Sequence, residues 1–248
     1  MLIQYYYNQL NKLHQSVYTA MKIGLTSLQT SFLVPAVDKR DLQDIFFKVR
    51  LDCPEIFYAV NFKFKMYTDG VNIEVIPEYL FKKMKILENK KAINARITKL
   101  TRPALSMEEL EQEKYIHKFI CEKVHYDKLK KPYSHEIIGP LGHGVGVCEG
   151  IAKTVKILCD TLNIWCIIAI SDANPEKNIK YRHAWNIVKI KGRYYNWDAT
   201  FDNGLVNDNT TFDDNKKNKK ISYANFNRSD KEFFKNHEPA IYETPKCE

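Results

Sequence analysis

The sequence lacks the cysteine spacings of a disulfide framework or a structural zinc site. Its six cysteines are scattered over 248 residues, and no two form a CxxC pair or another finger-like spacing. Cys159 and Cys166 lie within apolar runs, where free thiols are ordinarily buried. We therefore expect neither disulfides nor structural zinc, and no metal or other cofactor.

Long apolar segments are also missing. No stretch approaches the ~18 consecutive apolar residues of a membrane span. Residues 1–8 show no basic segment followed by an apolar one, so no signal peptide is visible. The expectation is a protein without a membrane span and, by default, a cytoplasmic one. An extracellular or wall-associated location is the alternative if the natural chain is longer at its N-terminus.

Several common catalytic motifs are absent as well. Residues 142–146 are rich in glycine, but they have neither the GxGxxG spacing nor the GK[ST] ending of a phosphate-binding loop. The chain has no GxSxG serine elbow and no HExxH zinc helix. The usual nucleotide-binding, serine-hydrolase and zinc-protease patterns are thus not found.

The net charge is +8, and part of this excess is concentrated in two lysine clusters. Such runs are usually solvated loops, and the sharper alternative is an attraction to acidic protein or wall polymer. No aromatic residues alternate with the lysines and no nucleic-acid-binding module is recognisable, so nucleic acid is not an expected partner. The clusters consist of Lys128, Lys130 and Lys131, and of Lys216, Lys217, Lys219 and Lys220.

The first half of the chain reads as helices with one hairpin. Apolar residues recur at helical spacing in the first thirty residues, and Asp38 is placed to cap a second helix. Aromatic and β-branched residues over 57–67 and 71–76 flank Asp69-Gly70, a hairpin signal. A basic helix is expected over 78–100. Pro103 then interrupts the pattern, which divides the chain into an N-terminal region, 1–105, and a core domain, 106–248.

The core domain is predicted to mix helices and strands. Ser106 and Glu109 have the spacing of a capping box for a helix that runs to about Val124. After a loop over 127–147, a helix begins near Cys148, with Lys153 and Lys156 expected to point away from its apolar face. Strands are expected over 165–171, 183–190 and 193–200. The predicted fold class is therefore α+β.

Cys148 lies where a glycine-rich loop meets this helix. A helix N-terminus presents free N–H groups and a positive dipole end, which stabilise a thiolate and can form an oxyanion hole. Gly146 and Gly150 would let a substrate backbone approach closely. The alternative is a small core cysteine at a helix start.

His183 and Asp198 are predicted to share one face of a hairpin. A two-residue loop at 191–192 pairs Ile190 with Arg193 and makes His183 and Asp198 diagonal neighbours, about 7–8 Å apart at the backbone. An imidazole needs such a partner to fix its tautomer when it activates a thiol. Taken singly, each residue has a structural alternative: a satisfied strand histidine, or an aspartate in a turn.

The three segments around these residues resemble one known family. Gly-Val-Cys148-Glu-Gly-Ile-Ala, His183-Ala-Trp-Asn-Ile-Val and Tyr-Tyr-Asn-Trp-Asp198-Ala-Thr are similar to the transglutaminase-like superfamily, with a Cys at a helix start and His and Asp on consecutive strands. The resemblance covers about residues 115–204. Residues 51–58, 225–230 and 245–247, with His237, are similar to stand-alone bacterial members.

This resemblance implies a papain-like core, with the helix that bears the nucleophile packed on an antiparallel sheet. Cys148 would be acylated, His183 would move the proton and Asp198 would hold the imidazole. Trp185 and Trp197 would form cleft wall or core, and Tyr133 or Ser134 would supply a second oxyanion donor. Calcium belongs to larger animal members, and Asp202, Asp208, Asp213 and Asp214 do not establish a calcium site here.

The expected function is cysteine-dependent acyl transfer on peptide or protein amides, through a thioester, without a cofactor. Hydrolysis by water is slightly favoured over transamidation, because water is always available and the sequence shows no motif for a dedicated amine site. The alternative is a catalytically silent domain of this fold that binds peptide or cell-wall polymer.

Overall fold

The computed structural model describes residues 3–68, 70–177, 179, 181–203 and 221–248. The chain packs as two compact units, Leu2–Ala92 and Ile93–Glu248, referred to below as the N-terminal unit and the C-terminal unit. The break lies within helix α4 (Lys83–Thr101). The sequence placed a domain boundary at residues 105 and 106, and that these regions are separate domains stays a prediction.

The N-terminal unit combines helices with a small antiparallel sheet. Strand order in the sheet is β1-β3-β2. The helix cap at Asp38 is confirmed, since its carboxylate accepts from the backbone N–H of Asp41 at 2.9 Å. The hairpin is confirmed by the pairing of Phe64 with Val75, whereas Asp69 in its turn lies outside the described residues. The elements are α1 (Tyr5–Asn8), α2 (Lys12–Thr26), β1 (Phe32–Pro35), α3 (Lys39–Asp52), η1 (Pro54–Ile56), β2 (Ala59–Met66) and β3 (Asn72–Tyr79).

A buried carboxylate joins the first helices of this unit. Asp52 at the end of α3 accepts from the N–H groups of Tyr6 and Tyr7 at 3.2 and 3.0 Å. It also accepts from the hydroxyl of buried Tyr18 at 3.1 Å. Strand β1 was not predicted, because a four-residue edge strand leaves too short a pattern to separate from a loop.

The C-terminal unit follows α4 with a run of short elements before one long buried helix. The elements are η2 (Arg102–Ala104), α5 (Glu109–Lys123), β4 (His125–Tyr126), η3 (Pro132–His135), η4 (Gly139–His143), β5 (Val145–Gly146), α6 (Cys148–Thr161), β6 (Trp165–Ser171), η5 (Pro175–Lys177), β7 (His183–Ile190), β8 (Arg193–Trp197), α7 (Ala199–Asp202) and α8 (Asp230–Phe233). The fold is α+β, as the sequence predicted.

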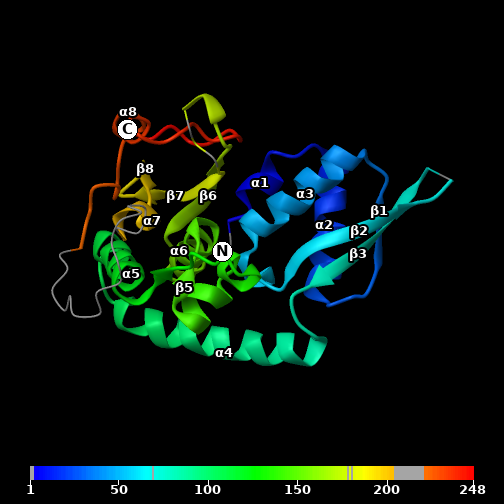
Figure 1. Ribbon diagram of the computed structural model, residues 1–248, viewed down its shortest axis with the longest axis horizontal. Coiled ribbons are helices and arrows are strands. Elements are labelled where there is room, and N and C mark those ends of the chain that lie inside the picture. Colours follow the sequence, from blue (N-terminus) through cyan, green and yellow to red (C-terminus); the bar gives the residue numbers. More distant parts are fainter. Residues whose placement is uncertain (1–2, 69, 178, 180, 204–220) are drawn as a thin grey trace. The chain divides into compact units, whose positions relative to one another are not determined.

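Helix α6 is the centre of the C-terminal unit. It packs on β6 and β7 of an antiparallel sheet of order β6-β7-β8 (Figure 1). Helix α5 packs against α6 as well. Every residue of α6 from Gly150 to Cys159 is buried. A helix covered on all sides gives its first residue, Cys148, a fixed position relative to the sheet.

The prediction that Lys153 and Lys156 point away from the core was wrong. Both are fully buried. The ammonium of Lys153 lies 2.9 Å from Glu136 and 2.8 Å from Glu149, and that of Lys156 lies 3.0 Å from Asp160. A charge is tolerated in such a place only when it is paired. Glu149 and Asp160 lie four residues away on α6 itself, whereas Glu136 comes from the segment before it.

The predicted capping box was also wrong. Helix α5 begins at Glu109, and its N-cap residue Glu108 makes no side-chain cap hydrogen bond. Ser106 lies two residues too early to cap it. The box motif identifies a helix start only when the first turn begins directly after the serine.

The register predicted for the hairpin is confirmed. Ile190 pairs with Arg193, and the ladder continues to the pair Asn186 and Trp197. Strand β8 ends there, earlier than the predicted residue 200. Asp198 therefore lies just beyond the strand, as the N-cap of α7. Among the helices described, none has the length and apolar composition needed to cross a membrane.

Candidate active site

Cys148 is the first residue of α6, and the preceding loop fixes it there. The N–H of Val147 donates to the carbonyl of Ser134 at 3.0 Å, and the carbonyl of Val147 accepts the first helical bond, from Ile151 at 2.9 Å. The thiol is partly exposed. The first N–H groups of a helix have no partner within it, so they are available to a negative sulfur or a developing oxyanion.

Glycines let the loop lie against this helix. A Cβ on Gly150 would lie 2.2 Å from the carbonyl oxygen of Ser134, and one on Gly146 would lie 2.8 Å from Pro140. Gly146 and Gly150 are therefore needed for packing around Cys148. That they also let a substrate backbone approach stays a prediction.

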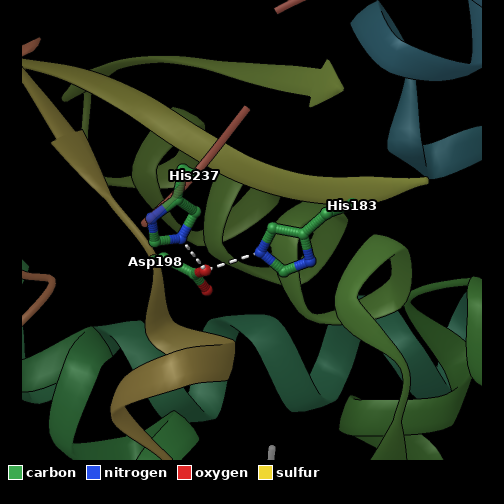
Figure 2. A group of neighbouring side chains, drawn as sticks. All are labelled: His183, Asp198 and His237. Carbon is green, nitrogen blue, oxygen red and sulfur yellow. Dashed lines mark hydrogen bonds and ion pairs between the residues drawn. The ribbon is translucent and has the colours of Figure 1, made fainter. Parts of the chain in front are cut away.

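His183 opens β7 and is bonded to Asp198. Its Nε2 lies 2.6 Å from Oδ2 of Asp198, as Figure 2 shows. The imidazole also interacts with the Cys148 thiol, by a hydrogen bond and by charge. Since Nε2 faces the carboxylate, Nδ1 is the ring nitrogen left for the sulfur. The structure thus brings the three residues singled out in the sequence into one chain of contacts.

The Asp198 carboxylate is buried and fully bonded. Its Oδ1 accepts from the N–H groups of Thr200 and Phe201 at 2.8 and 3.1 Å, which caps α7. Its Oδ2 accepts from His183 and from a second imidazole, that of His237, at 2.6 and 2.9 Å. Four donors leave the carboxylate little freedom to rotate.

Burial and ion pairing compete at these groups. Burial alone would lower the pKa of His183, but the bonded Asp198 carboxylate and the Cys148 thiol outweigh it and raise the pKa to about 10. Burial would likewise raise the pKa of Asp198, but His183 and His237 hold it well below its usual range. At neutral pH, His183 is therefore an imidazolium between a carboxylate and a thiol.

His237 is the site residue that sequence reasoning missed. It follows α8 and reaches Asp198 from 39 positions further along the chain. The segment was noted only for its likeness to stand-alone bacterial proteins. No local spacing ties a histidine after Phe233, Phe234 and Asn236 to a strand end that far away, so only the fold brings them together.

Trp185 and Trp197 lie in the core, one of the two places that the sequence analysis allowed. Both are at most 1% exposed. The indole N–H of Trp185 donates to Asn196 at 2.9 Å, and that of Trp197 donates to Nδ1 of His117 at 2.9 Å. They support the strands that carry His183 and Asp198.

Of the two residues suggested as a second oxyanion donor, Ser134 is already engaged. Its hydroxyl donates to Asp127 at 2.5 Å, and it is buried. The ring of Tyr133, which is half-buried, packs on His143 with ring centres 4.6 Å apart. A role for Tyr133 in binding substrate or an oxyanion stays a prediction.

Tyr126 lies near the nucleophile, and Tyr181 lies near Tyr126. Burial, together with the Cys148 thiol and the Tyr181 phenol, raises the pKa of Tyr126 to about 12. The ammonium of Lys130 lies 3.7 Å from the centre of the Tyr181 ring. The exposed lysines 128, 130 and 131 follow Tyr126 closely in the chain, and Lys130 contacts Tyr181. Lysines 216, 217, 219 and 220 lie outside the described residues.

Among the described residues, His183, Asp198 and His237 are also the one cluster of three His, Cys, Asp or Glu side chains whose possible metal-ligand atoms lie within 4.8 Å of one another. Both imidazoles, however, point at a single carboxylate oxygen at hydrogen-bond distances (Figure 2). This is a hydrogen-bonded chain rather than a set of ligands around a common point. Asp202 is bound to Ser222 and Asn225, and Asp208, Asp213 and Asp214 lie outside the described part of the chain.

Comparison with known proteins agrees with this geometry. The family model of the transglutaminase-like superfamily matches residues 91–199, a range that contains Cys148, His183 and Asp198. No curated protein matches the chain.

Similar solved structures are distant in sequence. A transglutaminase structure is 11% identical, with a TM-score of 0.40 over 76% of this chain and 54% of its own. A proposed cysteine protease from Cytophaga hutchinsonii is 14% identical, with a TM-score of 0.35 over 57% of this chain and 62% of its own. A proposed protease from Parabacteroides distasonis is 11% identical, with a TM-score of 0.32 over 56% and 36%. This chain thus spans about half of the transglutaminase that it matches. By its family match, the chain carries a domain of the transglutaminase-like superfamily over residues 91–199.

Proposed function

We propose that this protein is a cysteine-dependent acyl-transfer enzyme that acts on peptide or protein amides. The observation that carries the proposal is the chain of contacts from the Cys148 thiol, at the start of α6, through His183 to the buried Asp198. A structural cysteine at a helix start has no need of a histidine that is held protonated by a buried carboxylate.

The proposed reaction begins with the sulfur as nucleophile. The imidazolium of His183 stabilises a negative sulfur, which attacks the amide carbonyl. N–H groups at the start of α6 bind the oxyanion that develops. His183 gives a proton to the leaving amine, the C–N bond breaks, and a thioester on Cys148 remains. Asp198 keeps its bond to Nε2 throughout, so the ring stays in the tautomer whose Nδ1 faces the sulfur.

The second half of the reaction releases the acyl group. A water molecule attacks the thioester, His183 takes its proton, and the carboxylic acid departs as the sulfur is regenerated. A primary amine in place of water would give a new amide by the same steps. We propose hydrolysis as the main outcome, because water is always present.

Lys128, Lys130 and Lys131 point to acidic protein or polymer as a favoured substrate. These lysines are exposed, and the ammonium of Lys130 lies over the ring of Tyr181. Tyr181 and Cys148 both lie near Tyr126. Charges at such a rim attract substrates of opposite sign and raise the rate of encounter.

The test is to trap the thioester. The protein would be incubated with a peptide library in ¹⁸O-enriched water, with and without an added primary amine, and digested for mass spectrometry. We expect an acyl adduct on Cys148 and ¹⁸O in the released peptide acids. The Cys148→Ala protein, the matched control, should show neither.

Two results would contradict the proposal. Products that persist in Cys148→Ala would remove the cysteine mechanism. Peptides that bind without any adduct or product, together with a Cys148 that iodoacetamide labels no faster than an ordinary cysteine, would favour the silent binding domain.

A further inference from the structure

A second histidine binds the same oxygen of Asp198 as His183 does. Figure 2 shows the two imidazoles on either side of the carboxylate. Nε2 of His237 lies 2.9 Å from Oδ2 of Asp198, against 2.6 Å for His183. An ionised carboxylate can only accept, so Nε2 of His237 must carry a proton.

The His237 ring is held tightly enough to fix this bond. It stacks on Phe233 with ring centres 3.7 Å apart, and the Phe201 ring lies tilted against it at 4.5 Å. At the other end of the ring, Nδ1 lies 2.7 Å from Oδ1 of Asn236 and 3.2 Å from the carbonyl of Phe233. The side chains of His237 and Asp198 are each 1% exposed, so water does not replace this donor if it is lost.

A buried carboxylate needs such a donor at one stage of the proposed reaction. While His183 is an imidazolium, Asp198 has a cation beside it. Once His183 has given its proton to the leaving amine, the Asp198 carboxylate, itself only 1% exposed, faces a neutral ring. Burial then favours the protonated acid, which could no longer accept from Nε2–H.

We propose that His237 is a positioning residue of the acyl-transfer site, a second imidazole donor that keeps Asp198 ionised and directed at His183 when His183 is neutral. This inference rests on the proposed function, because the role given to His237 is a step of acyl transfer. The measurements that test it need no substrate. Besides Asp198, the titratable group facing the His237 ring is His183, at 5.6 Å between ring centres, and its other described ring neighbours are Trp185, Phe201 and Phe233.

Two variants separate donation from packing. His237→Phe keeps an aromatic ring for Phe233 and Phe201 but has no N–H. His237→Gln loses the ring but carries an amide N–H that can reach Asp198. A purely structural role predicts that Phe is the better replacement, whereas a positioning role predicts that Gln is.

The primary measurement follows the Asp198 carboxyl directly. In protein labelled with ¹³C-aspartate, its Cγ resonance, assigned by its loss in Asp198→Asn, would be titrated from pH 7 down to the lowest pH at which the protein stays folded. We expect protonation at a pH higher by about 1 unit or more in His237→Phe, since a donor to the charged form is lost, and near-wild-type behaviour in His237→Gln. An unchanged midpoint in His237→Phe, or an equal shift in both variants, would overturn the proposal.

The rate at which iodoacetamide alkylates Cys148 gives a second readout that needs no substrate. This alkylation rate falls as pH is lowered. The pH at which it falls should be higher in His237→Phe than in wild type, and close to the wild-type value in His237→Gln. If His237→Phe does not fold, ¹⁵N spectra of the histidines in the wild-type protein test the proposal instead. They would contradict it if Nε2 of His237 carried no proton between pH 5 and pH 8. A protein that forms no acyl-enzyme but shows these shifts would lose the proposed function and keep this inference.

Discussion

Trp197 donates its indole N–H to Nδ1 of His117 at 2.9 Å, which settles the tautomer of a buried histidine next to the site. With Nδ1 accepting, the proton is on Nε2, which donates to the carbonyl of Ser222 at 2.8 Å. A second proton on His117 would break the bond to Trp197. The residue after Trp197 is Asp198, so this pair anchors the end of β8 on α5.

Acid should therefore weaken the fold through His117. Burial lowers its pKa, against partial opposition from Ser222, Asp202 and Asp198. A histidine with a lowered pKa in the folded state contributes stability above its unfolded value of ~6.5 and loses that stability as pH falls below it. We expect the free energy of unfolding to drop as pH falls below ~6.5, with a slope from this histidine of at most about 1.4 kcal/mol per pH unit.

Urea unfolding at several pH values measures this slope. His117→Gln should be less stable at pH 7.5 by about 1–3 kcal/mol, because hydrogen bonds to Trp197 and Ser222 are lost, but its slope below pH 6.5 should be shallower. The exposed His125→Gln is the control. An identical slope in His117→Gln and wild type would rule out this origin of acid sensitivity.

Cys148→Ala and His183→Ala should each abolish turnover. Cys148→Ala should leave the urea midpoint of unfolding nearly unchanged, whereas His183→Ala should lower it, because the buried Asp198 carboxylate loses an ion-pair partner. Asp198→Asn should lower kcat by about 10²–10⁴-fold, as loss of a tautomer-fixing partner does. Activity should also fall as pH rises through about 10, because His183 then loses the proton needed by the leaving amine. Cys121→Ala is the control, since its thiol also lies near a histidine, 3.6 Å from His117.

Gly150→Ala should distort the start of α6. Its Cβ would lie 2.2 Å from the backbone oxygen of Ser134, which cannot move without shifting the loop that fixes Val147. We expect a loss of about 3 kcal/mol or more and slower alkylation of Cys148. Gly142→Ala, which meets the flexible side chain of Ile138 at 3.3 Å, should cost clearly less. Equal effects of the two changes on unfolding would contradict this account.

Glu113→Gln should stabilise the protein at alkaline pH. Burial, aided by Glu109, raises the pKa of Glu113 to about 8 against the opposing effects of Asn227 and Lys114. Oε2 of Glu113 accepts from Asn227 at 2.8 Å, while the other side-chain oxygen of each residue has no partner among the described atoms. A proton on Glu113, or the amide of Gln, supplies the missing donor.

The sign of the pH dependence follows from the raised pKa. The folded state holds a proton that the unfolded chain releases above ~4.3, so stability declines as pH rises from there through about 8. Glu113→Gln should exceed wild type by about 1–3 kcal/mol at pH 8.5 and converge with it near pH 4.5. The exposed Glu111→Gln should change little. A less stable Glu113→Gln at pH 8.5 would refute the prediction.

Replacing Lys128, Lys130 and Lys131 with Gln should lower kcat/KM for acidic peptides by about 3–10-fold at low salt, with the difference vanishing near 0.5 M salt. The physical reason is that the lysines attract acidic peptides electrostatically, and salt screens this attraction. Neutral peptides should be cut at unchanged rates. An effect that ignores salt would point instead to damage to the Lys130–Tyr181 contact. The charge-matched control replaces three exposed lysines of α4: Lys83, Lys85 and Lys91.

The hairpin that carries His183 could be read from the sequence because its information is local. A two-residue loop fixes the register, and alternation then fixes which side chains share a face. The helix start at Cys148 is local too, since the glycine-rich loop ends there. Asp198, by contrast, was placed in a strand although it caps α7, because strand and cap compete over one or two residues.

What the sequence determined by itself was thus the order of elements, the register of the hairpin and the identity of the thiol, imidazole and carboxylate. Tertiary structure alone decided that Lys153 is buried between carboxylates, that Trp197 fixes the tautomer of His117, and that His237 shares an oxygen of Asp198. Periodicity and capping depend on residues close together in the chain, so they can be predicted from the sequence. The contacts of Lys153 with Glu136, of Trp197 with His117 and of His237 with Asp198 depend on which distant segments the packed core brings together, and no spacing in the sequence records that.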